Sequence, residues 1–132
     1  MGENIAKNWL TEVEQTVAAK EYDAHMDLIS KKVNLFGVPG FDVINYDAWS
    51  QQCKFEFEEG LIQSVTYDGL KILATTQTKI MFKTFEIVKG TDGTINQQGI
   101  EVLLEKEDDD KWRLVQERIL PPEEVEFDRQ KS

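Results

Sequence analysis

The chain has 132 residues, of which 40% are hydrophobic and 30% are charged, and this composition predicts one folded domain rather than a disordered segment. The 15 Lys and Arg side chains against 25 Asp and Glu give a net charge of −10. Such a surface repels phosphate backbones and anionic headgroups, which argues against nucleic acid or a membrane as partner.

The N-terminal segment has neither a basic n-region nor an apolar h-region, so no signal peptide is expected. The longest apolar run is far shorter than a membrane span. Cys53 is the single cysteine, which excludes an intrachain disulfide. We therefore expect a cytoplasmic protein, with one domain over residues 1–121 and a charged C-terminal tail over residues 122–132.

Apolar residues recur at helical spacing in three segments of the first half. The first segment predicts a helix of about five turns over residues 5–20, and the second predicts a shorter helix over residues 22–29. A short strand follows at residues 33–36. A third helix, capped by Asn45 or Asp47, is expected to end at Gly60.

The second half reads as long strands joined by tight turns. The Asp68–Gly69 pair interrupts the first of them and is either a hairpin turn or a bulge that bends one long strand. We favour the bend, with the turn near Thr76–Gln77, because neighbouring strands then match in length. Further turns are expected at Asp92–Gly93 and at residues 108–110. Residues 79–89 are apolar on both faces, so both faces are expected to be covered.

Helices followed by an antiparallel meander predict an α+β domain with the helices on one face of the sheet. The strings that carry a family resemblance are residues 23–30 before a short strand, Tyr46-Asp47-Ala48-Trp49 at the start of the third helix, and a turn followed by Lys111-Trp112-Arg113-Leu114-Val115. Together with the order of elements from about Ile5 to Pro121, they make the chain resemble the nuclear-transport-factor-2-like superfamily, in particular its SnoaL-like branch.

This resemblance implies a cone-shaped, cystatin-like roll in which three N-terminal helices pack on a strongly curved antiparallel sheet and leave a pocket at the wide end. It also implies frequent homodimers that pack sheet against sheet. The superfamily includes isomerases, dehydratases, cyclases, epoxide hydrolases and binding proteins, so function has to be argued from the pocket residues.

His25 is the only histidine and the first candidate for a catalytic acid or base near neutral pH. It falls on the expected inner side of the second helix. Asp27 cannot pair with it on a helix, because positions i and i+2 point to opposite sides. The alternative is a partly buried histidine hydrogen-bonded to the backbone.

Strict alternation along the last strand places Gln116 and Arg118 on the same side as Trp112. Arg118 is then a candidate anchor for a ligand carboxylate or phosphate, or the partner of Glu101 or Glu86 in a salt bridge. The facing residues on the preceding strand, Ile100, Val102 and Leu104, carry no acid or base. This argues against a general base on the sheet.

Aromatic side chains are the remaining candidates for a ligand-binding site. They either line an apolar cavity or form plain core, and they are Tyr22, Phe36, Phe41, Tyr46 and Trp49. One histidine and one cysteine do not make a metal site, and no Gly-rich phosphate loop is present. We therefore expect neither metal nor cofactor.

Three functions remain open. The first is a pocket protein that binds a small, largely apolar ligand as a homodimer. The second is an isomerase, dehydratase or cyclase in which His25 is the acid or base and Tyr22 or Tyr46 donates a hydrogen bond to a developing oxyanion. The third is an interaction module that buries the apolar face of residues 79–89 against another protein.

Overall fold

A computed structural model describes residues 2–125 and shows three helices, six strands and a C-terminal helical turn. The helices and strands are α1 (Gly2–Ala18), α2 (Tyr22–Met26), β1 (Ile29–Phe36), β2 (Ile44–Asn45), α3 (Tyr46–Glu58), β3 (Ile62–Thr75), β4 (Lys79–Gly90), β5 (Ile95–Lys106) and β6 (Trp112–Ile119). The helical turn covers residues 122–125.

The α1 and α3 helices form for the reasons that the sequence indicates. One face of α1 is buried, with Trp9, Leu10 and Val13 in the core. The α3 helix begins at the Asn45 cap, whose Oδ1 accepts a hydrogen bond from the Ala48 backbone N–H at 3.0 Å. It ends before Gly60, which has a φ of +62° and supplies the left-handed residue of a helix terminus.

The α2 helix is shorter than predicted. It ends at Met26, and β1 begins at Ile29 rather than at Val33. The Leu28 carbonyl accepts hydrogen bonds from the Trp9 indole and from the Leu114 backbone N–H, both at 3.0 Å. These long-range bonds hold the chain after Met26 in the sheet. The local apolar spacing alone predicts that the helix continues to residue 29.

The six strands form one sheet in the order β2-β1-β6-β5-β4-β3. The predicted antiparallel sheet is wrong in one pairing, because β1 runs parallel to β6, so the sheet is mixed. The Asp68–Gly69 bend is confirmed. The β3 strand continues through it, with an irregular register against β4 between Asp68 and Lys71 and a Gly69 φ of +76°.

Four helical segments, rather than three, are present in the part of the chain that the structure describes. The fourth, over residues 122–125, packs on the outer face of the sheet, where the Glu124 carboxylate accepts hydrogen bonds from Lys83 and Arg118 at 3.0–3.1 Å. The rest of the predicted tail, residues 126–132, lies outside the described residues.

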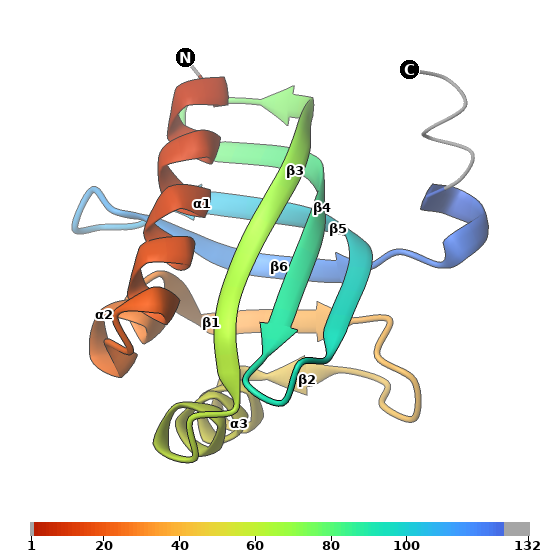
Figure 1. Cartoon of the computed structure of the whole chain (residues 1–132). Coiled ribbons are helices and arrows are strands. Elements are labelled where there is room, and N and C mark those ends of the chain that lie inside the picture. Colours follow the sequence, from red (N-terminus) through yellow and green to blue (C-terminus); the bar gives the residue numbers. More distant parts are fainter. Residues whose placement is uncertain (1, 126–132) are drawn as a thin grey trace.

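The sheet curls around α1, so that its edge strand β3 returns alongside this helix (Figure 1). The core lies between α1 and the inner face of the sheet, and Phe82, Ile100, Val102, Leu104 and Leu114 are fully buried there. The three facing strands β4, β5 and β6 supply these residues. At the end of the core nearest to α3, the curled sheet and the helices enclose a cavity.

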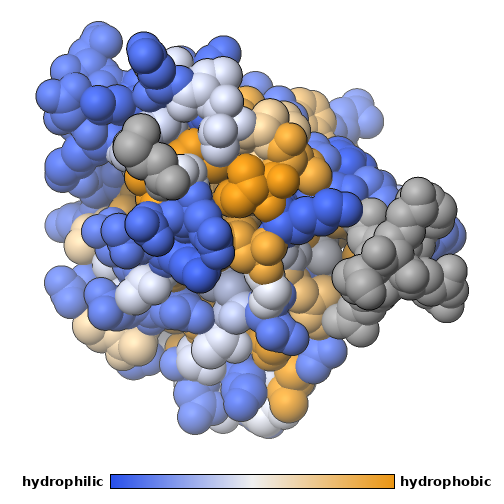
Figure 2. All heavy atoms as spheres, turned by 90° about the horizontal axis from the view of Figure 1, so that it is seen from above, coloured by the Kyte–Doolittle hydropathy of each residue, from blue (hydrophilic) through white to orange (hydrophobic). Residues whose placement is uncertain are grey.

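The face shown in Figure 2 carries many hydrophilic side chains, as expected from the charge of the chain. Figure 2 looks down on the end where α1 begins and shows apolar side chains gathered in the middle of this face. Leu73, which is 40% exposed, belongs to the end of β3 on this side. No helix in residues 2–125 has the length and apolar character needed to cross a membrane.

Candidate functional site

An inner cavity of about 380 Å³ lies between the helices and the concave face of the sheet. Its walls are mostly apolar, and polar side chains enter it from α2, α3 and the four strands β3 to β6. Its aromatic and polar lining residues are Trp9, His25, Trp49, Cys53, Glu56, Phe57, Tyr67, Glu86, Gln98 and Glu117. A concave apolar cavity with a few convergent polar groups is typical of small-molecule sites.

Three of these polar residues form a row across neighbouring strands. Tyr67 on β3 pairs with Glu86 on β4, and Glu86 pairs with Gln98 on β5. The Tyr67 hydroxyl donates to Glu86 Oε2 at 3.1 Å, and Gln98 Nε2 donates to Glu86 Oε1 at 3.0 Å. Burial raises the pKa of Glu86, while these two donors oppose that rise by stabilising the ionised form.

Glu117 on β6 is the second carboxyl on this face and has no such support. Its side chain is 8% exposed and lines the inner cavity. Among residues 2–125, no hydrogen bond or ion pair reaches its carboxyl group. Burial, together with the charge of Glu86, raises the pKa of Glu117 well above its ordinary value. Glu117 therefore keeps its proton under conditions in which a surface glutamate is ionised.

A bulge in β6 turns Glu117 inward. Pairing with β5 runs Leu104 to Leu114 and then Leu103 to Gln116, so Val115 is an extra residue on β6. Leu114 faces the core before the bulge, and Glu117 and Ile119 face the inner cavity after it. One extra residue reverses which side chains point inward.

His25 lines the inner cavity as a neutral imidazole. Its Nδ1 lies 3.2 Å from Thr16 Oγ1, and that hydroxyl donates its own proton to the Val13 carbonyl. When the Thr16 hydroxyl donates to Val13, Nδ1 carries the hydrogen of the bond to Thr16 and the lone pair lies on Nε2. Burial lowers the pKa of His25 to about 4.

Cys53 and Glu56 on α3 complete the titratable groups of the cavity. Burial raises the pKa of Cys53 to about 12, so its thiol is not a nucleophile near neutral pH. Burial also raises the pKa of Glu56. Within the described residues, no three His, Cys, Asp or Glu side chains come together in a group that could hold a metal ion.

No protein-family model matches the sequence, and no curated protein matches it. Solved structures do match its fold. A nuclear-transport-factor-2-like protein of unknown function from Shewanella oneidensis superposes with a TM-score of 0.76 at 15% identity, covering 90% of this chain and 98% of that one. The chain has the nuclear-transport-factor-2-like fold.

Two further structures share this nuclear-transport-factor-2-like fold. A putative scytalone dehydratase from Novosphingobium aromaticivorans has a TM-score of 0.71 at 10% identity, covering 89% of this chain and 81% of that one. A Catenulispora acidiphila protein in complex with S-DNPA has a TM-score of 0.69 at 13% identity, covering 89% of this chain and 92% of that one. At such identities the likeness establishes the fold, and function has to come from the site.

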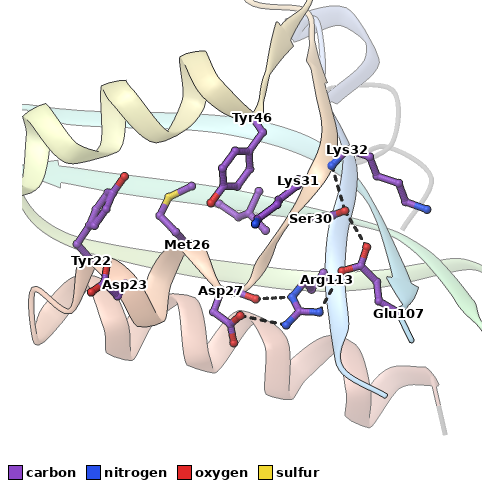
Figure 3. A pocket seen from close by; sticks show the side chains of 11 residues that line it. Tyr22, Asp23, Met26, Asp27, Ser30, Lys31, Lys32, Tyr46, Glu107 and Arg113 are labelled. Carbon is purple, nitrogen blue, oxygen red and sulfur yellow. Dashed lines mark hydrogen bonds and ion pairs between the residues drawn. The ribbon is translucent and has the colours of Figure 1, made fainter. Parts of the chain in front are cut away.

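The nuclear-transport-factor-2-like fold separates the residues predicted for one site. His25 and Trp49 line the inner cavity. Tyr22 and Tyr46 instead line an outer pocket of about 650 Å³ beside α2 and β1 (Figure 3). The Tyr22 hydroxyl donates to the Ser50 carbonyl at 3.0 Å, so neither of these two tyrosines shares a cavity with His25.

Arg113 dominates the outer pocket, but its guanidinium is already occupied (Figure 3). It donates to the backbone carbonyl and carboxylate of Asp27 and to the carboxylates of Glu107 and Asp109, at 2.8–3.1 Å. An arginine held by three carboxylates is a structural tie between α2, β6 and the preceding turn. Within residues 2–125, the outer pocket therefore offers no free guanidinium for a ligand anion.

Gln116 and Arg118 point away from the inner cavity, and their prediction on the Trp112 side is wrong because of the Val115 bulge. Arg118 pairs with Glu101 and Glu124, which confirms the salt bridge to Glu101. The predicted bridge to Glu86 is wrong, since Tyr67 and Gln98 hold that carboxyl.

Two aromatic candidates also lie elsewhere. Phe41 is 62% exposed in the loop after β1, and Phe36 lines a separate hollow on the outer surface together with Arg118. The expectation that the sheet offers no acid or base is wrong, because Glu86 and Glu117 both face the inner cavity. The inward position of Glu86 follows from alternation along β4, whereas that of Glu117 has no local sequence signal.

Proposed function

We propose that the protein binds a small, largely apolar molecule in the inner cavity and transfers a proton to or from it. The observation that carries this proposal is the Glu117 carboxyl, which is buried at the cavity wall and has no partner among the described residues. A carboxyl that opens onto a cavity without a protein partner is available to a ligand, so such a group marks a candidate functional site.

The two carboxyls suit different roles. Glu86 accepts two hydrogen bonds and is the group that holds a negative charge more readily. Glu117 accepts no hydrogen bond within residues 2–125, and its pKa is raised well above the ordinary value, so it is the group that holds a proton more readily. Two acids with environments that separate their pKa values are a recurrent arrangement in acid–base catalysis. This arrangement supports isomerase, dehydratase or cyclase chemistry, with Glu117 as proton donor or acceptor.

His25 has a supporting role in this proposal. The predicted pairing of His25 with Tyr22 or Tyr46 is wrong, because both tyrosines lie in the outer pocket. Tyr67 is the tyrosine that shares the inner cavity with His25. As a neutral imidazole with a lone pair on Nε2, His25 accepts a hydrogen bond from the ligand and orients it next to Glu117.

Binding without catalysis is the second candidate. It is supported by the aromatic walls, to which Trp9, Trp49 and Phe57 contribute, and by the cavity volume, which suits a molecule of one or two rings. Homodimer formation and a cytoplasmic location stay predictions. A binding role is also supported by the Catenulispora acidiphila structure, which has a similar fold and was solved in complex with S-DNPA.

The experiment is proton exchange on a neutral bicyclic ketone, 2-tetralone, in D₂O, followed by mass spectrometry. The wild-type protein is expected to speed deuterium uptake next to the carbonyl. Glu117→Gln keeps the shape of the side chain but cannot ionise, and is expected to lower the rate by about 10²-fold or more. Glu101→Gln, on the outer face of β5, is the matched control and should retain the rate.

The exchange rates separate the two candidates. Wild-type protein that binds 2-tetralone without any exchange above buffer contradicts proton transfer and supports a binding role. Exchange that survives in Glu117→Gln assigns the chemistry to another group and contradicts the role given to Glu117.

A further inference from the structure

Among the residues that the structure describes, acidic side chains line the inner cavity and no lysine or arginine does. Glu56, Glu86 and Glu117 all reach it. The one basic side chain there is His25, and burial lowers its pKa to about 4, so it is neutral near pH 7. A negatively charged ligand would therefore meet three carboxyl groups and no cationic side chain among the described residues.

The basic side chains near the site are held outside it. Arg113 is tied to Asp27, Glu107 and Asp109 at the outer pocket, and Arg118 is tied to Glu101 and Glu124 on the outer face of the sheet. The same strand thus places its two arginines in salt bridges and leaves Glu117, between them, without a countercharge among the described residues.

A buried carboxyl without a countercharge has two ways to lower its free energy. It keeps its proton, or it ionises against a cation that enters the site. An ammonium group suits the second way, because it brings three donors to an acceptor that lacks any. Glu117 faces the cavity, so a ligand can reach it.

The walls of the inner cavity suit the remainder of such a ligand. Trp9, Trp49, Phe57 and Tyr67 contribute aromatic faces, which hold an apolar ring and also attract a nearby cation. Two of these rings are fixed by other contacts. The Trp9 indole donates to the Leu28 carbonyl at 3.0 Å, and the Phe57 ring lies 5.3 Å from the His25 ring.

We propose that the inner cavity selects small apolar molecules that carry a basic nitrogen, which bind as the ammonium against the ionised carboxylate of Glu117. This inference rests on the proposed function, since it names the substrate class for the same cavity. The net charge of −10 favours the approach of such cations over long distances.

The proton balance of binding is simple. An amine that arrives as the ammonium displaces the proton of Glu117 to solvent, and an N–H group then donates to the carboxylate. An amine that arrives neutral takes the Glu117 proton itself, and none is released. The other titratable groups that line the cavity with Glu117 are His25 on α2, Cys53 and Glu56 on α3, Tyr67 on β3 and Glu86 on β4. Glu14 on α1 lies next to them and accepts a hydrogen bond from the Tyr67 backbone N–H.

The test uses three probes with one bicyclic skeleton and different charge. They are 2-aminotetralin as its hydrochloride, the neutral 2-tetralol, and the anionic 1,2,3,4-tetrahydronaphthalene-2-carboxylate. Titration calorimetry at neutral pH, in two buffers with different heats of ionisation, measures affinity and released protons. We expect the ammonium to bind at least about tenfold more tightly than the alcohol, with proton release, and the carboxylate to show no binding.

Glu117→Gln is expected to abolish the preference for the ammonium and the proton release, while still binding 2-tetralol. Retained binding of the alcohol shows that the cavity is intact. Glu117→Asp restores a carboxyl and should recover part of the preference, and Glu101→Gln on the outer face should behave as wild type.

Several outcomes overturn the inference. They are equal affinity for ammonium and alcohol, a preference that persists in Glu117→Gln, and the failure of all three probes to bind. The proposed function fails separately. If 2-tetralone exchanges its protons but the ammonium has no preference, only this inference is wrong. If the ammonium is preferred but no exchange occurs, only proton transfer is wrong.

Discussion

His25 is the residue whose ionisation can be measured without ambiguity, because the chain contains one histidine. His25 is 8% exposed, its Nδ1 is hydrogen-bonded to Thr16, and its ring packs on the Phe57 ring. Burial lowers its pKa from 6.5 to about 4. We expect the single imidazole resonance in a ¹H–¹³C NMR titration to stay neutral through pH 6 and to shift only near pH 4.

The sign of the effect on stability follows from this shift. Between pH 6.5 and about 4, the unfolded chain binds a proton at His25 that the folded protein does not bind. The free energy of unfolding therefore falls as pH drops through this window, by about 3 kcal/mol for this group. His25→Gln, measured by urea denaturation, should lack that part of the decline. A midpoint near pH 6.5 in the NMR titration would contradict both expectations.

At the level of elements, turn chemistry made the strands of the second half readable from the sequence. The turn at Asp92–Gly93 is encoded in two residues, whereas the bend at Asp68–Gly69 could be chosen over a turn only because the neighbouring strands then match in length. The Val115 bulge could not be predicted, because the extra residue is defined only by the pairing of β6 with β5. Strict alternation along β6 therefore misses Glu117 as a cavity residue and assigns Gln116 and Arg118 to the wrong face of the sheet.

The bend in β3 contributes to the site and can be tested at Gly69. This residue has a φ of +76°, and a methyl group added at its Cα would meet only open space. Its carbonyl accepts a hydrogen bond from the Thr84 hydroxyl. Tyr67, two residues earlier, reaches the inner cavity, while Leu70 and Ile72 pack on the core. The bend thus lets one strand serve both the cavity and the core.

Gly69→Ala is expected to lower the free energy of unfolding by about 1–2 kcal/mol, because an L residue at positive φ carries backbone strain and no side-chain clash adds to it. Gly69→Asn should cost less, since Asn tolerates this conformation better. Urea denaturation of the three proteins checks the order. Equal stability of Gly69→Ala and the wild type would show that the bend adjusts to another conformation.

At the level of the whole molecule, the inner cavity is assembled from all three helices and from every strand except β2. The sequence indicated the layers, since helix and strand patterns are local. It did not indicate which aromatic residues share a cavity, because the way the helices pack on the sheet places Trp49 at the inner cavity and Tyr22 and Tyr46 at the outer pocket.

The outer face of the sheet is the surface on which the predicted homodimer can be tested. Met81, Phe85 and Leu103 are apolar, lie on this face and keep partial exposure, which supports association because exposed apolar surface favours burial.

Light scattering coupled to size exclusion should give roughly twice the monomer mass of 15.2 kDa. Leu103→Lys places a charge in the middle of this face and should give monomers. Ile95→Lys, at the 56% exposed start of the same strand, should leave the mass unchanged. A monomeric wild-type protein would contradict the homodimer and favour a different protein as the partner of this face.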